Sequence, residues 1–321
     1  MTHFVGHEEA WRQFSNALNS GKLHHGWILA GPRGIGKANF ALRAAAALVD
    51  PDNQFASMIE RGSHPDILSV KRLPKEPPKD DEEPDPDAEL KRSISIDQIR
   101  RLQASLTTRP GLAERRAVII DSADDLERGG ANALLKSLEE PPAGTFFLLV
   151  SHASDRLLPT VRSRCQLLRF EPLSDEAMAS TLRTLAPDAS REDITALVRA
   201  GNGSPGQALD FLGLDMGLLE DAMMSIITSG DLNNELRSSL AGQLALKAAQ
   251  PRYEAFLRRA PSLIADKARQ MDVVNFPSAI EAWQKASTLA ARAIALSLDK
   301  HSVVFQMGSL MASLQPHKQA R

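Results

Sequence analysis

The stretch WILAGPRGIGKAN, residues 27–39, decides the fold. Its first four residues form an apolar run, and the glycine loop that follows is predicted to lead into a helix. The loop matches the pattern G-x-x-x-x-G-K from Gly31 to Lys37. In such a loop, Gly31, Gly34 and Gly36 let backbone N–H groups turn inward, the helix N-terminus adds a positive dipole, and Lys37 reaches the terminal phosphates. The sequence therefore predicts a phosphate-binding loop (P-loop) between a strand and a helix.

Two residues depart from the pattern of an active nucleotide hydrolase. An active P-loop has Ser or Thr after the lysine, where the hydroxyl binds Mg²⁺, and this chain has Ala38. The second departure follows the apolar run at 117–120, which is typical of a buried parallel strand that delivers Asp121 to a nucleotide site. Asp121 would order Mg²⁺, but Ser122 stands where many families have a Glu that polarises water. Because both departures remove metal-and-water chemistry, we expect that hydrolysis has been lost.

The composition is that of an ordinary globular protein. The chain has 321 residues, of which 43% are hydrophobic and 24% charged, which suggests about two domains, or three if some are small. A net charge of −2 excludes an overall basic nucleic-acid-binding protein, so any contact with DNA has to come from a local patch. The N-terminus has no signal pattern, and no stretch approaches the ~20 apolar residues of a membrane helix.

The single cysteine excludes an internal disulfide and a cysteine-based zinc site. This suits a reducing cytosol, so we expect a cytoplasmic protein without a structural metal. The adjacent His24 and His25 would point to opposite faces of a strand, which favours packing or a polar contact over metal binding. Ser151 follows an expected strand and could touch a γ-phosphate, although polar residues are common at strand ends.

Strands that alternate with helices predict a doubly wound α/β domain over residues 1–172. A capping box at Ser95 and Gln98 opens one of its helices, and another is expected at 132–140. No strand pattern appears beyond this domain, so we expect a small helical lid domain at 173–214 and an all-helical domain at 215–321. The expected strands lie at 27–30, 67–70, 117–121, 145–150 and 167–170.

Two features outside the P-loop have open interpretations. The clearest late helix, at 278–298, is predicted to place Ile280, Trp283, Ala290 and Ile294 on one face, and its alanines allow close helix packing. That face fits either the core of a bundle or an oligomer seam. The stretch 75–89 is rich in Pro, Asp and Glu and cannot bury a core, so it is expected to be a solvated acidic insertion.

Four motifs together resemble the bacterial clamp-loader subunits of DNA polymerase III, which are of the AAA+ class. The resemblance covers the first two expected domains well and the third only by length and helicity. The second half of the α/β domain carries the more specific motifs, while the P-loop alone is less specific. The motifs are LHHG at 23–26, GPRGIGK at 31–37, NALLKSLEEPP at 132–142 and SRC at 163–165.

The resemblance implies a member of a ring of AAA+ subunits that loads the sliding clamp onto primed DNA, within the DNA-directed DNA polymerase holoenzyme. Some ring members do not hydrolyse ATP. The arginine of their Ser-Arg-Cys motif, here Arg164, enters the ATP site of a neighbouring ATPase subunit. The implied partners are the gamma/tau and delta subunits, and through them the clamp and primer–template DNA, with no membrane. No cofactor would be required, although ATP or ADP could bind without hydrolysis.

The departures favour a non-hydrolysing ring member. ATPase subunits of this family carry an arginine where this chain has Gly206, and many members carry a four-cysteine zinc module that the region 50–64 lacks, so zinc is not expected. Two alternatives stay open: an active gamma/tau-like ATPase, and a P-loop protein unrelated to replication. Lys37 either binds phosphate or belongs to a vestigial loop, and the alternative for Arg164 is a surface salt bridge. Cys165 is interpreted as a small packed residue.

Overall fold

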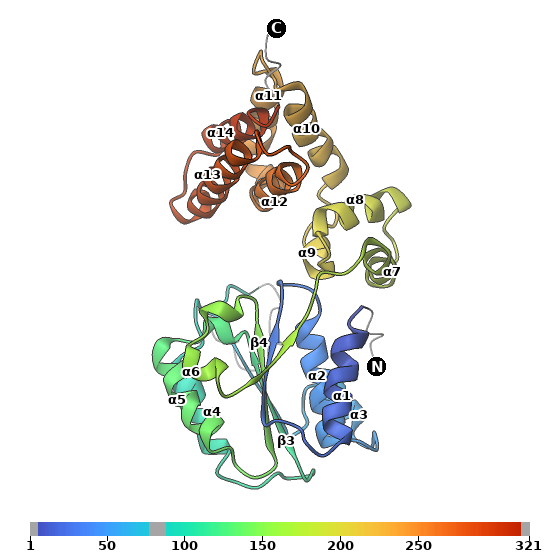
Figure 1. Cartoon of the computed structure of the whole chain (residues 1–321), viewed down its shortest axis with the longest axis vertical. Helices are drawn as coiled ribbons and strands as arrows, with labels where there is room; N and C mark the ends of the chain where they lie inside the picture. Colours follow the sequence, from blue (N-terminus) through green and yellow to red (C-terminus); the bar gives the residue numbers. More distant parts are fainter. Residues whose placement is uncertain (1–5, 77–87, 316–321) are drawn as a thin grey trace. The chain divides into compact units, whose positions relative to one another are not determined.

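Figure 1 shows the computed structural model of the chain, which describes residues 6–76 and 88–315. The chain divides into two compact units, Met1–Thr181 with Gly203–Gly206, and Leu182–Asn202 with Gln207–Arg321. The first unit thus contains the P-loop, Arg164 and the segment around Gly206. The division into three domains, with boundaries at 172/173 and 214/215, stays a prediction.

The first unit is built on a parallel sheet, in which the described residues supply five strands in the order β2-β3-β4-β1-β5. Strand β1, which lies between β4 and β5, is buried throughout, as expected for an apolar run covered on both faces. The α/β P-loop fold class is therefore confirmed. The strands are β1 (Gly26–Ala30), β2 (Ile67–Lys71), β3 (Arg116–Asp121), β4 (Thr145–Ser151) and β5 (Gln166–Arg169).

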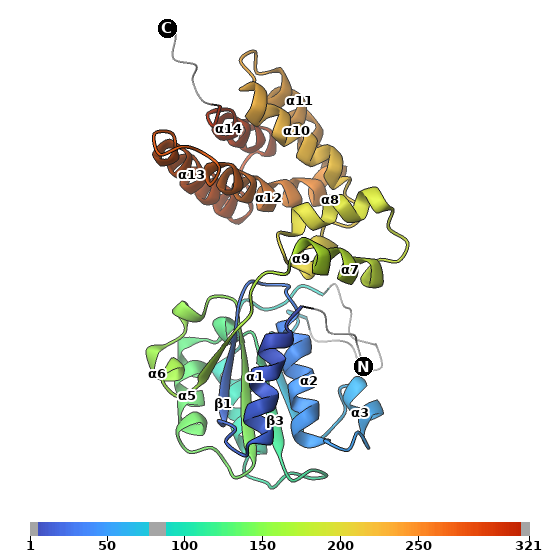
Figure 2. The ribbon, with the colours of Figure 1, turned by 45° about the vertical axis from the view of Figure 1, so that its right-hand side comes forward.

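Helices cover both faces of this sheet, as Figures 1 and 2 show. One face carries a core around Phe14, Trp27 and Phe40. The core of the other face includes Ile99 and Leu134. The helices are α1 (Glu8–Asn19), α2 (Lys37–Val49) and α3 (Ala56–Glu60) on the first face, and α4 (Ile96–Ser105), α5 (Arg128–Glu139) and α6 (Pro159–Arg162) on the second, with 3-10 turns at Ala123–Asp125 and Ser154–Arg156.

The predicted capping box is present, since the Ser95 and Gln98 side chains both reach backbone groups at the start of α4. The predicted start of α5 at residue 132 was wrong, because the helix begins at Arg128. Its first turn contains Gly129 and Gly130, and glycine has a low helix propensity, so the sequence pattern placed the start of the helix too late. In the structure both lie close to α4, where a Cβ on Gly129 would be 3.3 Å from Ile96 Cδ1. These glycines therefore let the two helices pack closely.

Most of the acidic insertion at 75–89 lies outside the described residues, but its two ends are visible. The Lys75 N–H donates to the Glu89 carbonyl at 2.7 Å, and the Lys91 N–H donates to the Leu73 carbonyl at 2.7 Å. An antiparallel bridge pairs Pro74 with Leu90. The chain thus leaves and re-enters the fold at neighbouring points.

The second unit is helical. Its core contains Met223, Phe256 and Met307, and the buried Arg259 guanidinium donates to Glu220 Oε1 at 2.5 Å. The helices are α8 (Arg191–Gly201), α10 (Met216–Ser229), α11 (Glu235–Ala245), α12 (Gln250–Ala268), α13 (Phe276–Ala295) and α14 (Lys300–Ala312), with a 3-10 turn at Lys247–Ala249, while α7 (Asp175–Leu185) and α9 (Pro205–Leu209) run across the boundary between the units. Across the described residues, no helix is long and apolar enough to span a membrane.

The structure decides against the bundle-core interpretation of the apolar face predicted for the late helix, and the oligomer seam stays a prediction. Trp283 and Ile294 on α13 are 38% and 57% exposed. The helix instead buries a stripe of alanines, Ala279, Ala282, Ala286 and Ala293, and it packs against α12 and α14. Small side chains let helices approach closely, so the alanine face lies inside the bundle. Large apolar side chains are left at the surface of this helix.

Candidate functional site

The P-loop occupies residues 31–36, between the end of β1 and the start of α2. Gly34 and Gly36 have φ angles of +79° and +96°, in the left-handed region that favours glycine. A Cβ added to Gly31 would lie 2.3 Å from the Phe170 carbonyl oxygen, so no larger residue fits there. The predicted strand–loop–helix context is therefore present, and the turns of the loop depend on the glycines to which the sequence analysis gave this role.

Lys37 is folded back onto its own loop. Its side chain is only 3% exposed, and Nζ donates to the Gly31 carbonyl at 2.7 Å and also to the Pro32 carbonyl. Burial lowers the pKa of Lys37 to about 8, although the carboxylates of Asp121 and Asp124 oppose that change. A phosphate would have to displace both carbonyl contacts to reach this ammonium group. Ala38, next on α2, offers no hydroxyl to a metal ion.

The carboxyl ends of β3 and β4 meet beside this loop. Asp121 ends β3, pairs in register with Val150 of β4, and contributes to the field around Lys37. Ser151 ends β4, pairs with Ala30 of β1, and is fully buried. Its hydroxyl donates to Asp124 Oδ1 at 2.9 Å. The serine is therefore hydrogen bonded to a carboxylate of its own chain, which the sequence did not predict.

The sequence did not identify Asp124, which lies beside the P-loop at the carboxyl ends of β3 and β4. Besides Ser151, it accepts hydrogen bonds from the Ser122 hydroxyl at 3.1 Å and from the N–H groups of His152 and Ala153 at 2.6 and 3.2 Å. Burial would raise the pKa of Asp124, but these hydrogen bonds more than offset it and hold that pKa below its usual value. The carboxylate thus joins the ends of β3 and β4. The sequence offers one sign of this role, namely that Asp124 follows Asp121 by three residues.

The segment around Gly206 closes directly onto the P-loop within the first unit. The Gly206 N–H donates to the Gly34 carbonyl at 2.8 Å, and the Ser204 hydroxyl donates to the Arg33 carbonyl at 2.8 Å. A Cβ on Gly206 would lie 2.9 Å from Gly34 Cα. Any side chain at this position would collide with the loop backbone. The glycine thus allows a contact that the arginine expected in an ATPase subunit would prevent.

Arg164 lies at the opposite end of the sheet. It precedes β5, which pairs parallel to β1 from Trp27–Gln166 to Ala30–Arg169, whereas the P-loop follows Ala30. A Cβ on Gly26, at the start of β1, would lie 3.2 Å from the Arg164 carbonyl. At about 3.3 Å per residue, the length of β1 separates the arginine from the P-loop by more than about 13 Å. Arg164 and Lys37 therefore belong to two separate sites.

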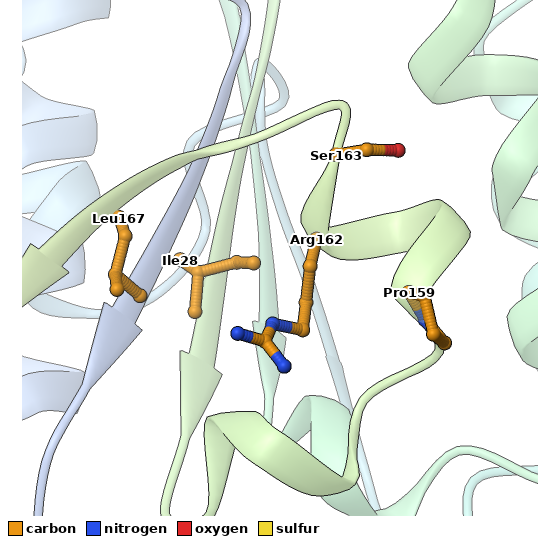
Figure 3. A pocket seen from close by; sticks show the side chains of 5 residues that line it. All are labelled: Ile28, Pro159, Arg162, Ser163 and Leu167. Atoms are coloured by element: carbon orange, nitrogen blue, oxygen red, sulfur yellow. The ribbon is translucent and has the colours of Figure 1, made fainter.

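The Arg164 side chain is 35% exposed and bonded within its own chain. Nη2 pairs with Glu139 Oε1 at 2.6 Å, and Nη1 donates to the Thr160 carbonyl at 3.0 Å and to the Ser163 hydroxyl at 3.2 Å. A cavity of about 320 Å³ adjoins this segment and is shown in Figure 3, where Arg162 extends toward Ile28. Burial raises the pKa of the Cys165 thiol to about 12, so this residue is a packed thiol and a poor nucleophile.

The paired histidines make polar contacts. His25 Nε2 lies 2.8 Å from the Leu138 carbonyl, and His24 Nδ1 lies 2.9 Å from the Gly26 carbonyl. Within 6–76 and 88–315, no group of three or more His, Cys, Asp or Glu side chains is placed to hold a metal ion. The polar role is therefore the one that these contacts support. The absence of zinc stays a prediction, which elemental analysis would check.

Comparison with known proteins identifies the family. The family described as "DNA polymerase III, delta subunit" matches residues 6–174, more than half of the chain. The chain belongs to the delta-prime clamp-loader family of DNA polymerase III. "DNA polymerase III subunit delta'" of Pseudomonas aeruginosa is 33% identical over 206 residues, which cover 61% of this chain and 58% of that protein. The Escherichia coli subunit of the same name is 38% identical over 119 residues, 37% of this chain and 35% of that protein.

Relatives named as gamma subunits are also found. "DNA polymerase III subunit gamma" of Buchnera aphidicola is 27% identical over 286 residues, which cover 86% of this chain and 71% of that protein. The chain spans less than two thirds of either delta-prime relative. Membership of the delta-prime clamp-loader family is thus shown, which confirms the resemblance seen in the motifs.

Proposed function

We propose that this chain is a ring member of the DNA polymerase III clamp loader that does not hydrolyse ATP. It helps to load the sliding clamp onto primed DNA, and it supplies Arg164 to the ATP site of a neighbouring gamma/tau subunit. Its other partners are the delta subunit and, through the complex, the clamp and primer–template DNA. It requires no cofactor for this role, and its P-loop serves as a structural joint.

The position of Arg164 carries this proposal. The arginine lies at the end of the sheet remote from the P-loop of its own chain, so it cannot act on a nucleotide bound there. It is exposed enough to reach a ligand on another subunit. A guanidinium delivered by a neighbour offsets the charge that builds on the phosphate oxygens during γ-phosphoryl transfer. An arginine in this position is suited to stabilise the phosphate charge in another subunit's ATP site.

The P-loop end of the sheet supports the same proposal over an active ATPase. Lys37 is bonded to its own loop, Ala38 and Ser122 lack the metal hydroxyl and the water-polarising carboxylate, and Gly206 packs on the loop. We expect the isolated chain to show no ATP hydrolysis above background. Ala38→Thr alone should not restore it, because the carboxylate at position 122 is still absent. Turnover that Lys37→Ala abolishes would establish the gamma/tau-like alternative instead.

The direct test uses rings reconstituted with gamma/tau and delta subunits. Failure to co-purify with them would refute the proposed membership of the ring. In assembled rings, Arg164→Ala should slow the DNA- and clamp-stimulated ATPase, with equal assembly verified by size-exclusion chromatography. Arg164→Lys should rescue poorly, because a point charge does not reproduce the planar fork of the guanidinium. Equal rates for wild-type and Arg164→Ala rings would remove the proposed role of the arginine.

A further inference from the structure

Glu139 occupies a position that its own helix does not favour. It is the last residue of α5, where the helix dipole presents partial negative charge and disfavours a carboxylate. Its side chain is 48% exposed and pairs with Arg164, 25 residues further along the chain. The carboxylate therefore gains from Arg164 an interaction that the end of the helix does not provide.

The contacts of Arg164 occupy both terminal nitrogens of its guanidinium. Nη2 pairs with Glu139 at 2.6 Å, while Nη1 donates to the Thr160 carbonyl and the Ser163 hydroxyl at 3.0 and 3.2 Å. Guanidinium groups bind phosphate through two parallel N–H donors. Each pair of neighbouring donors on Arg164 includes Nη2 as one member. A phosphate that engages two donors must therefore use the nitrogen that now pairs with Glu139.

A carboxylate and a γ-phosphate cannot both occupy that nitrogen without strong repulsion, because like charges at contact distance oppose each other. The binding of phosphate thus requires Glu139 to withdraw. Half-exposed ion pairs are weak enough to be exchanged readily, and their typical strength corresponds to a factor of about two to five in an equilibrium constant. The pair can orient the arginine and still be displaced.

We propose that Glu139 is an intramolecular competitor for Arg164. It holds the guanidinium within its own chain until the γ-phosphate of the neighbouring subunit replaces it. This inference rests on the proposed function, and it adds a positioning residue that sets how readily the arginine engages. The carbonyl of Thr160 and the hydroxyl of Ser163 keep Nη1 in place during the exchange.

The first test uses the isolated full-length chain and needs no ring. Phenylglyoxal modifies free guanidinium groups, and mass spectrometry of the peptides reports the extent of labelling at Arg164. Glu139→Gln should increase that labelling about two- to fivefold, because the competing charge is lost. Glu140→Gln, a matched change at the next residue, should leave it unchanged. Equal labelling in wild-type and Glu139→Gln chains would overturn the proposal.

The second test uses assembled rings and separates this inference from the proposed function. Glu139→Gln should lower the ATP concentration for half-maximal turnover about two- to fivefold, with a larger effect on KM than on kcat. The effect should vanish in Glu139→Gln/Arg164→Ala, since a competitor acts only through the arginine. An effect that persists in the double variant, or a raised KM in Glu139→Gln, would contradict competition. If Arg164→Ala itself changes nothing, the proposed function fails, and the labelling result alone still decides the Glu139 contact.

Discussion

The two ends of the parallel sheet have opposite properties. At the carboxyl end, the P-loop is closed: Lys37 is 3% exposed and bonded to its own loop, and Gly206 packs on Gly34. At the amino end, Arg164 is 35% exposed and held only by weak contacts beside an open cavity. The P-loop end is held by contacts within the chain, while at the other end Arg164 remains a cation that solvent and a partner can reach.

Under the proposed function, this difference would explain how a P-loop protein keeps its fold without hydrolysing ATP. The residues that hold the loop in shape, such as Gly31 and Gly36, are needed for the strand–helix junction whether or not nucleotide binds. The residues needed only for hydrolysis are replaced by Ala38 and Ser122. In the proposed role, a ring that shares its ATP sites between neighbours would need only the Arg164 end from this chain.

The largest expected effect comes from comparing the two ends in one ring. Arg164→Ala should reduce hydrolysis at the neighbouring site, where such an arginine is worth on the order of 10³ or more in rate. The fall in total turnover should be smaller, because other sites keep their own arginines. Lys37→Ala should leave ring turnover within a factor of about two. ATPase assays on rings of matched assembly measure both, and an equal loss from the two variants would refute the separation of the ends.

The next effect concerns the closed end alone. Asp124→Asn should destabilise the isolated chain by about 3 kcal/mol, because it removes the charge and sets an amide donor against N–H and O–H donors. Asp121→Asn, three residues earlier, should cost less than about 1 kcal/mol, since Asp121 accepts none of the four hydrogen bonds described for Asp124. Urea denaturation measures both. Similar costs would mean that Asp121 also has a structural role.

The sequence predicted the sheet and the P-loop, because both depend on local pattern, whereas Arg164 was singled out only by the resemblance of the Ser-Arg-Cys motif. Apolar runs, glycine spacing and a capping box are visible in a short window of residues. Asp124 and Glu139 were missed because their partners, Ser151 and Arg164, lie 27 and 25 residues away. Only the pairing of strands and helices brings such residues together.

The helical unit shows the same limit. Apolar periodicity placed Trp283 and Ile294 on one face of α13 but left open whether that face lies in the bundle core or forms an oligomer seam. In the structure both side chains are exposed and alanines are buried. The large side chains would not allow the close approach of α12 and α14 that the alanines permit. Hydrophobicity alone therefore could not decide between the two interpretations, because the distance between helices also decides which side chains are buried.

The burial of Lys37 predicts a dependence of stability on pH. Its pKa is lowered to about 8 in the folded chain from 10.5 in the unfolded chain, so the unfolded state binds the proton more tightly. Below pH 8 the folded state carries the cost of a buried ammonium group, and that cost disappears as the pH rises toward 10.5. The free energy of unfolding should then gain up to about 3 kcal/mol over this range.

The matched variant for this measurement is Lys37→Met, which has no titrating group. Other groups contribute equally to both proteins, so the difference between their pH profiles isolates Lys37. Urea denaturation at pH 7.5 and pH 10 should show a larger gain for the wild type. If the two profiles are parallel, the lysine is hydrated and the P-loop is open to phosphate, and the contrast between the two ends of the sheet is lost.

The smallest expected effect tests how tightly the Gly206 segment closes on the loop. Gly206→Ala adds a Cβ that would lie 2.9 Å from Gly34 Cα and 3.0 Å from its carbonyl oxygen, and backbone atoms cannot move away cheaply. We expect a loss of about 1–2 kcal/mol. The control is Gly242→Ala in α11, where nothing lies within 4 Å of the added Cβ, so the better helix propensity of alanine should stabilise by about 0.5–1 kcal/mol. The two changes are chemically identical, so their opposite signs would come from the contact with Gly34. Amide hydrogen exchange reads each unit separately, and a gain in stability for Gly206→Ala would show that the P-loop is not closed by this segment.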